Sequence, residues 1–333
     1  MIPFFKQRLA VNVHLGSMNS LLLFLCISTS VLAQTPVEKA KKLWESKNPT
    51  EARKILLTID DDHRDYAEAQ FYLGRIAYDE KDYDTAEDYF EEAVDTNDKI
   101  AEYFNFLGNT YGLIAQEGNL IKQGIYVPKM RDAWQRTIEL DPKHIEAHWS
   151  LLQFYTRAPG FIGGSFTKAM EMANVIKKLN LGEGHRAIGT VYLREKKYAE
   201  AEKEFIAMAL ADQKYIPTLA NYYVSQKQFS KAHAVFEEAV KKNPEDYQSI
   251  YQYGKVSAIS GEKTDQGEAY LKKYLTHPVK GSEPSHAAAK MRLAQIQEKK
   301  GNKAEAIKLY QEALKSDQTL HEAKEGLKRL SSK

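Results

Sequence analysis

The 333-residue sequence contains one cysteine, Cys26, which lies inside an N-terminal apolar run. A single cysteine cannot form an intramolecular disulfide, and the rest of the chain has no thiol for catalysis or for a cysteine metal site. Proline and glycine are also scarce, with ten and eighteen residues. Several of them stand at junctions between repeated segments, such as Pro142, Pro244, Pro278 and Gly301.

The sequence has almost no net charge. It carries 47 Lys and Arg against 45 Asp and Glu, and its first 33 residues contain Lys6 and Arg8 but no acid. A chain beginning at Gln34 would therefore be neutral, which argues against nonspecific attraction to nucleic acid or to an anionic membrane. We expect no nucleic-acid partner, and membrane contact only through an uncleaved N-terminal segment.

Motifs of common enzymes are missing. There is no G-x-x-x-x-G-K-[ST] phosphate loop and no G-x-S-x-G nucleophile elbow. His144 and His148 stand four residues apart, but the metalloprotease order needs a glutamate where the chain has Ile145. The acidic run at 60–62 lacks the spaced Asp, Gly and Glu of a calcium loop. The sequence therefore predicts no metal, no cofactor and no enzyme.

The only long apolar run is N-terminal and reads LLLFLCIS at 21–28. It follows Lys6 and Arg8 and precedes Val31-x-Ala33, the pattern of a secretory signal peptide cleaved before Gln34. The run is shorter than an ordinary membrane span of about 20 residues. Three alternatives remain: lipidation at the cysteine, an uncleaved anchor, or a start at the second methionine. We expect an exported protein of the bacterial periplasm or cell envelope.

A repeat with a period of about 34 residues runs through the rest of the chain. From Gly74, Ala86 lies twelve residues on, Phe90 four further and Ala93 three further. Small residues at two fixed sites with an aromatic between them indicate a pair of closely packed helices, and this period is typical of a helical solenoid. The ladder recurs from Gly189, Ala220, Gly254 and Ala294.

These ladders resemble tetratricopeptide repeats over about residues 36–331. First-helix segments such as LGNTY at 107–111 and second-helix segments such as KDYDTAEDYFEEAV at 81–94 carry the resemblance. It implies an all-α, right-handed solenoid of about seven to eight helix–turn–helix repeats with a C-terminal capping helix. The predicted parts are a signal peptide (1–33), a degenerate first repeat (34–66), the solenoid (67–318), and a capping helix and tail (319–333).

Candidate binding residues lie on the first helix of each unit, which lines the concave surface of such a solenoid. Each unit has a small residue where its two helices touch. The candidates stand three residues before that residue, one residue after it, and four or five residues after it. The set is aromatic, amide and basic, a composition that suits carboxylates and peptide backbones. An ordinary solvated helix face is the alternative interpretation. The candidates are Phe71, Arg75, Tyr78, Asn109, Trp149, Gln153, Arg157, Arg186, Arg194, Asn221, Tyr251 and Lys255.

Some tetratricopeptide domains grip a terminal carboxylate with Lys and Asn residues on successive first helices. Asn109 matches one such place, but Asn105 stands where the lysine should be and Ser150 where the next asparagine should be. The clamp is therefore not transferred to this chain.

Two units are stretched, and we predict extended loops at 112–129 and 158–165 on one rim of the stack. The second loop reads APGFIGGS, and Ser165 looks like a helix N-cap. This run resembles one in little-characterised secreted bacterial tetratricopeptide proteins. The glycines could bring backbone N–H groups near a ligand, or the two loops could pack together as a plug.

Two functions therefore compete. The first is an exported scaffold that binds a protein or peptide in its concave groove, and we expect acidic or carboxylate groups on that partner. The second is capture of a small ligand, solute or lipid by the groove and the rim loops. A closed pocket lined by Trp149 and the loops would favour the second, and an open groove with exposed arginines would favour the first.

Overall fold

The computed structural model describes residues 34–331, so the predicted signal segment 1–33 and Cys26 lie outside the described residues. The chain forms two compact units, one up to Ile59 and one from Asp60 onward. All regular structure within residues 34–331 is helical, as the repeat pattern predicts. None of these helices combines the length and apolar character that crossing a membrane would require.

The described part of the first unit is one helix pair, α1 (Pro36–Glu45) and α2 (Pro49–Leu56). Thr35 and Glu38 form a reciprocal capping box at the start of α1, which satisfies two backbone N–H groups that the helix itself leaves unpaired. Ala40 and Ala52 are fully buried, so the two helices approach closely at small residues. This pair occupies the stretch that the sequence marks as a degenerate repeat.

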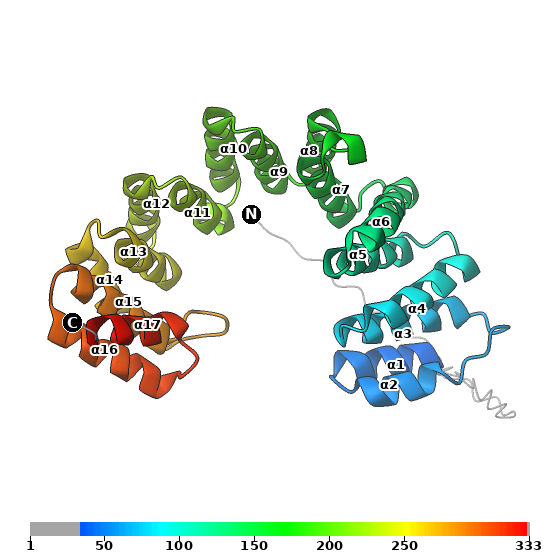
Figure 1. Ribbon diagram of the computed structural model, residues 1–333, viewed down its shortest axis with the longest axis horizontal. Coiled ribbons are helices and arrows are strands. Elements are labelled where there is room, and N and C mark those ends of the chain that lie inside the picture. Colours follow the sequence, from blue (N-terminus) through cyan, green and yellow to red (C-terminus); the bar gives the residue numbers. More distant parts are fainter. Residues whose placement is uncertain (1–33, 332–333) are drawn as a thin grey trace, which may run out of the picture. The chain divides into compact units, whose positions relative to one another are not determined.

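The second unit continues as successive helix pairs (Figure 1). Each second helix also packs against the first helix of the next pair, as α4 does on α5 and α12 on α13. The helices are α3 (Tyr66–Asp79), α4 (Tyr83–Thr96), α5 (Ala101–Glu117), α6 (Leu120–Leu140), α7 (Ile145–Arg157), α8 (Phe166–Leu179), α9 (Leu181–Arg194), α10 (Tyr198–Ala211), α11 (Ile216–Ser225), α12 (Phe229–Lys242), α13 (Tyr247–Ser260), α14 (Thr264–Tyr274), α15 (His286–Lys299), α16 (Lys303–Ser316) and α17 (His321–Ser331), with short 3-10 turns η1 (Gly160–Ile162) and η2 (Gln213–Tyr215).

The repeated small and aromatic residues form the contact between the two helices of a pair. An added Cβ at Gly74 of α3 would lie 2.7 Å from the ring of Phe90 on α4, which is fully buried. Gly254 of α13 makes the equivalent close contact with α14, but the side chain that an added Cβ would touch there is Leu271 rather than an aromatic ring. The small residue of α14 is Gly267, one position beyond the Gln266 that the spacing indicates, so the register of that unit is corrected by one residue.

The many tyrosines are explained by a recurring arrangement in which a buried ring extends its hydroxyl to a glutamate. Tyr253 is fully buried and its hydroxyl donates to Glu237 over 3.0 Å. Burial, with the hydrogen bond to the carboxylate, raises the pKa of such tyrosines above its usual range. The polar end of each ring is thereby satisfied while its apolar body fills the core. Similar pairs are Tyr111–Glu91, Tyr223–Glu202 and Tyr310–Glu298.

The predicted loop at 112–129 is wrong, because these residues lengthen α5 and α6 and only the turn around Gly118 separates them. The stretched spacing of this unit is taken up by longer helices, although Pro128 stands inside α6. Tertiary contacts offset its cost, since the Tyr126 hydroxyl donates to Glu87 over 2.9 Å and the Lys129 ammonium to Glu91 over 3.1 Å. These bonds hold the first half of α6 against α4.

The loop at 158–165 exists and is tightly built. Gly163 has a φ of +111°, which favours glycine, and a Cβ at Gly164 would lie 1.8 Å from the carbonyl oxygen of Ala158. Ser165 accepts a hydrogen bond from the backbone N–H of Lys168 over 3.3 Å, which confirms the predicted N-cap of α8. The loop therefore presents its apolar tip in a defined position.

The C-terminal helix α17 closes the stack by packing against α15 and α16. Ala323 is fully buried, and Leu327 and Leu330 pack against the same core cluster. Arg292 of α15 holds the Glu322 carboxylate with both terminal nitrogens, one of them at 2.9 Å. This helix covers the apolar face that the last repeat would otherwise expose.

Candidate partner-binding groove

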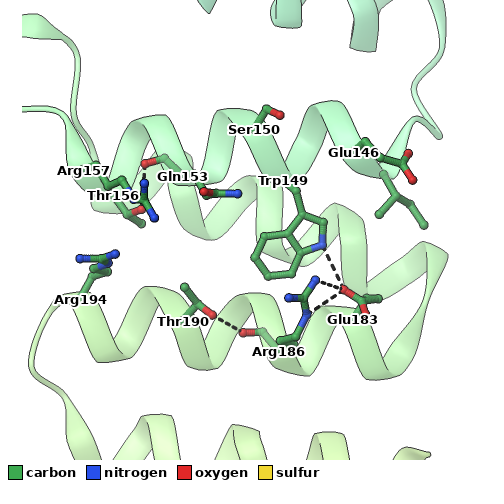
Figure 2. Close-up of a pocket in the computed structure, with 11 residues that line it drawn as sticks. Glu146, Trp149, Ser150, Gln153, Thr156, Arg157, Glu183, Arg186, Thr190 and Arg194 are labelled. Atoms are coloured by element: carbon green, nitrogen blue, oxygen red, sulfur yellow. Dashed lines mark hydrogen bonds and ion pairs between the residues drawn. The ribbon is translucent and has the colours of Figure 1, made fainter. Parts of the chain in front are cut away.

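A groove of about 750 Å³ lies between the first helices of two consecutive units, α7 and α9. Figure 2 shows side chains of both helices, among them Trp149 and Arg186, in the space between them. The lining residues are Ile145, Glu146, Trp149, Ser150, Gln153, Thr156, Arg157, Glu183, Arg186, Thr190 and Arg194.

One end of the groove is built on the carboxylate of Glu183, near the start of α9. The Arg186 guanidinium stacks over the Trp149 ring, 4.1 Å from its centroid, and its Nε donates to Glu183 over 2.9 Å. The Trp149 indole N–H donates to the same carboxylate over 3.2 Å and the Tyr215 hydroxyl over 2.8 Å. The aromatic ring and the cation are therefore held in place by one acid (Figure 2).

This network changes the charge that the groove presents. Burial alone would raise the pKa of Glu183, but the hydrogen bonds from Arg186, Tyr215 and Trp149 outweigh burial and lower that pKa. Glu183 is thus ionised at neutral pH and neutralises Arg186. Although Arg186 lies where the sequence places it, its positive charge is largely cancelled within the protein. The pairing could have been read from the sequence, because the two residues are three apart on one helix.

The other end of the groove holds two arginines that are not neutralised. Arg157 and Arg194 occupy the last turns of α7 and α9, both are exposed, and Figure 2 shows them on facing sides of the groove. Neither guanidinium has a carboxylate within ion-pair distance among residues 34–331. Two free guanidinium groups at one place can receive a carboxylate in a bidentate manner.

A second cavity of about 510 Å³ adjoins this groove on the side of α5 and α6. The two cavities share Ser150, Gln153 and Arg157, so they form one continuous surface. The second cavity is mostly apolar, and its walls include Leu113 and Ile162. We call the first cavity the arginine groove and the second the apolar pocket.

Among the candidate residues, two more belong to the apolar pocket. Tyr78 and Asn109 line it, and the Asn109 side-chain oxygen accepts the Trp134 indole N–H over 2.9 Å. Asn221 is exposed and Lys255 is half-buried, and neither lines the arginine groove or the apolar pocket. The structure therefore brings together Tyr78, Asn109 and the candidates of α7 and α9, but not the other candidates of α3 or those of α11 and α13.

Phe71 and Tyr251 are buried, so the prediction that they are exposed in the groove is wrong. Phe71 stacks on Tyr103 of α5 with 4.7 Å between ring centroids, and Tyr251 packs on Tyr274 at 5.2 Å. Both stand three residues before the small site. In these two units that position is buried at the contact between neighbouring helices, whereas Trp149 and Arg186, at the same repeat position, line the groove.

Arg75 is also poorly placed to meet a partner. Its guanidinium lies 3.9 Å from the centroid of the Phe106 ring, and burial lowers its pKa. The side chain is half-buried and packs on aromatic rings. It lines neither the arginine groove nor the apolar pocket, because its guanidinium packs on aromatic residues of α3 and α5.

The histidine pair has a structural role as well. His144 caps α7 by accepting the Ala147 backbone N–H over 3.2 Å, and its other ring nitrogen lies 3.0 Å from Glu102. His148 is buried, with one ring nitrogen 3.0 Å from the Pro142 carbonyl oxygen. Across residues 34–331, no three His, Cys, Asp or Glu side chains gather in a way that could hold a metal ion.

The family of the chain follows from its repeats. The model for the tetratricopeptide repeat matches residues 37–99, 218–282 and 256–320. These ranges cover the helices from α1 to α4 and from α11 to α16. The chain is a tetratricopeptide repeat protein.

Comparison with individual tetratricopeptide and related proteins supports the fold. Over 290 residues the chain is 24% identical to mouse (Mus musculus) Superkiller complex protein 3, which covers 83% of this chain but only 17% of that protein. The chain thus spans about a sixth of that relative. It is similar in structure to yeast Tom70, with a TM-score of 0.52, 17% identity, and coverage of 82% of this chain and 57% of that one.

A tetratricopeptide repeat protein from Parabacteroides merdae gives a TM-score of 0.48 with 14% identity, over 89% of this chain and 97% of that one. Tetratricopeptide proteins are typically interaction scaffolds without catalytic activity, and they commonly bind proteins or peptides. The family thereby supports a scaffold in general. It does not say which surface binds or what is bound.

Proposed function

We propose that this tetratricopeptide protein is an exported scaffold that binds an acidic segment of another protein in the arginine groove. On this proposal the chain carries out no chemistry. It holds a partner through charge, hydrogen bonds and aromatic contact. Export rests on the signal-peptide pattern of residues 1–33.

The observation that carries the proposal is the pair of unneutralised arginines. Arg157 and Arg194 come from two consecutive repeats yet face each other across one groove (Figure 2). The third basic residue of the groove lining, Arg186, already has an acidic partner in Glu183. A carboxylate from outside would complete what the chain itself leaves open.

The alternative is capture of a small anionic solute in the same groove. The arginine groove and the apolar pocket together run across α5, α7 and α9, three successive first helices. At about 8–10 Å between packed helices, this surface is about 20 Å long. An extended segment covers that length with about six residues. A small solute would contact only one end of it, so we favour a protein segment.

Selection from a library of displayed random peptides tests the proposal. The protein should enrich peptides that contain Asp or Glu, whereas the Arg157→Ala, Arg194→Ala double variant should not. A matched control removes two positive charges elsewhere, through Lys178→Ala and Lys203→Ala on the second helices α8 and α10. The control should enrich the same peptides as the wild type. Enrichment without acidic residues, or equal enrichment by the double variant, would argue against the arginine groove.

A further inference from the structure

The apolar pocket is the largest feature of this surface that the arginines do not explain. Its walls come from three places: Leu113 on α5, Val127 and Met130 on α6, and Phe154 with Ile162 at the end of α7 and in the following loop. An apolar cavity on a protein surface is unfavourable unless something covers it. The predicted plug of two loops does not fill it, since the cavity remains between α6 and the 158–165 loop.

The chain maintains this pocket through costly local structure. The first half of α6 continues through an internal proline, which keeps Val127 opposite the loop. On the other side, the constrained glycines at 163 and 164 fix the turn that carries Ile162. Phe161, in the same turn, is 89% exposed and extends the apolar rim. Helix and loop are thus both arranged to present apolar side chains outward.

We propose that the apolar pocket receives bulky apolar side chains of the same partner segment whose acidic residue binds Arg157 and Arg194. The inference rests on the proposed function and specifies its partner. Two features of the surface support it. The pocket shares Arg157 and Gln153 with the arginine groove, so one continuous segment can reach both. The arginines favour an acidic group and the apolar pocket favours apolar side chains, so a ligand that fills both must carry both kinds of group.

The partner segment therefore has two different ends, with acidic residues at one end and large apolar residues such as Leu or Phe at the other. A volume of about 510 Å³ can hold more than one large side chain. The separation of the two ends, about one to two helix spacings of 8–10 Å, corresponds to about three to five extended residues. This spacing sets the design of the probe.

Four fluorescein-labelled hexapeptides test the inference by anisotropy. The first has two glutamates, two serines and two leucines in that order, and the second has the reverse order. The third keeps the glutamates and has serines in place of leucine, and the fourth keeps the leucines and has serines in place of glutamate. One of the two amphipathic peptides should bind at least about tenfold more tightly than either half-peptide.

Two variants assign the effect to the pocket. Ile162→Asn replaces part of the apolar wall with a neutral polar side chain and leaves the charge around Arg157 unchanged, so it should bring the affinity of the amphipathic peptide down to that of the glutamate-only peptide. Leu210→Asn makes the same change at a leucine that is 82% exposed on α10 and lines neither cavity, and it should leave the affinity unchanged. Thermal melting followed by circular dichroism confirms that both variants are folded.

The outcomes separate the two proposals. If the glutamate-only peptide binds through Arg157 and Arg194 but leucines add nothing, the inference fails and the proposed function stands. If the leucine-only peptide binds and the arginines are irrelevant, the proposed function fails. If decanoate competes as well as the amphipathic peptide, the surface binds a small amphipathic carboxylate and the peptide inference is overturned. Absence of binding by all four peptides up to about 1 mM contradicts both proposals.

Discussion

Replacing Glu183 with glutamine should strengthen the binding of an acidic peptide, although it removes stabilising contacts. In the wild type the Glu183 carboxylate accepts hydrogen bonds from Arg186, Trp149 and Tyr215, which lowers its pKa and keeps it ionised. Its negative charge cancels that of Arg186 and repels any acid that enters the groove. The glutamine variant keeps the shape of the side chain and removes that charge.

The expected gain in affinity depends on the distance between the Glu183 carboxylate and the acid of the peptide. Two unit charges about 7 Å apart interact by about 0.6 kcal/mol in water and by about 2 kcal/mol at a protein surface. The Arg186 side chain is 39% exposed and that of Glu183 21%, so solvent screens much of this interaction. We expect a gain of about 0.5–1 kcal/mol, or about two- to fivefold in affinity. The loss of charge-assisted hydrogen bonds should cost about 1–3 kcal/mol of folding stability.

The assay is fluorescence anisotropy with a labelled hexaglutamate peptide at low ionic strength, where exposed charges are least screened. Glu204→Gln is the matched control. Glu204 also pairs with a basic group, His185, at 2.6 Å, but it lies on α10 and does not line the groove. The control should bind like the wild type. If Glu183→Gln binds the peptide no better than the control does, Glu183 does not mask Arg186 and the description of the groove is wrong.

Three further predictions concern stability and processing. Gly74→Leu should destabilise the fold by about 1–3 kcal/mol or more, because a side chain there would overlap the buried Phe90 ring, and chemical denaturation with an unchanged midpoint would contradict the repeat register. Hydrogen bonds from Lys272 and Lys300 lower the pKa of Glu268 to about 2, so its contribution is present above about pH 4.5 and is lost as the pH falls toward 2. Glu268→Gln should therefore lower the free energy of unfolding by about 1 kcal/mol at pH 7, seen as a lower melting temperature, but not at pH 2. An equal shift of the melting temperature at both pH values would refute this. Intact-mass measurement of the exported protein should show cleavage after residue 33, and a mature chain that keeps the apolar run would exclude it.

The sequence predicts well what depends on the repeat itself. The contact between Gly74 and Phe90 follows from a small residue and an aromatic at fixed spacing, whatever the neighbouring units contain. Trp149 and Arg186 meet because they occupy the same position in successive units, and the period places equivalent positions side by side. These features could be predicted because they depend on local packing within and between neighbouring repeats.

The sequence predicts less well what depends on contacts between irregular units. The stretched spacing of one unit predicted a loop at 112–129, whereas bonds from neighbouring side chains to α4 keep the segment helical through Pro128. Phe71 is buried because the aromatic residues of α5 cover it, and the spacing within α3 does not reveal this. The apolar pocket between Val127 and Ile162 arises where two stretched units meet, and no repeat position encodes it.

The most direct test of the central claim is the affinity of the hexaglutamate peptide for three proteins measured side by side. These are the wild type, the Arg157→Ala, Arg194→Ala variant, and the Lys178→Ala, Lys203→Ala variant, which loses the same charge from α8 and α10. If Arg157 and Arg194 receive the acid, the arginine variant binds at least about tenfold more weakly, while the lysine variant binds like the wild type. Equal affinities for all three proteins, or an equal loss in both variants, would show that these arginines are not the binding site.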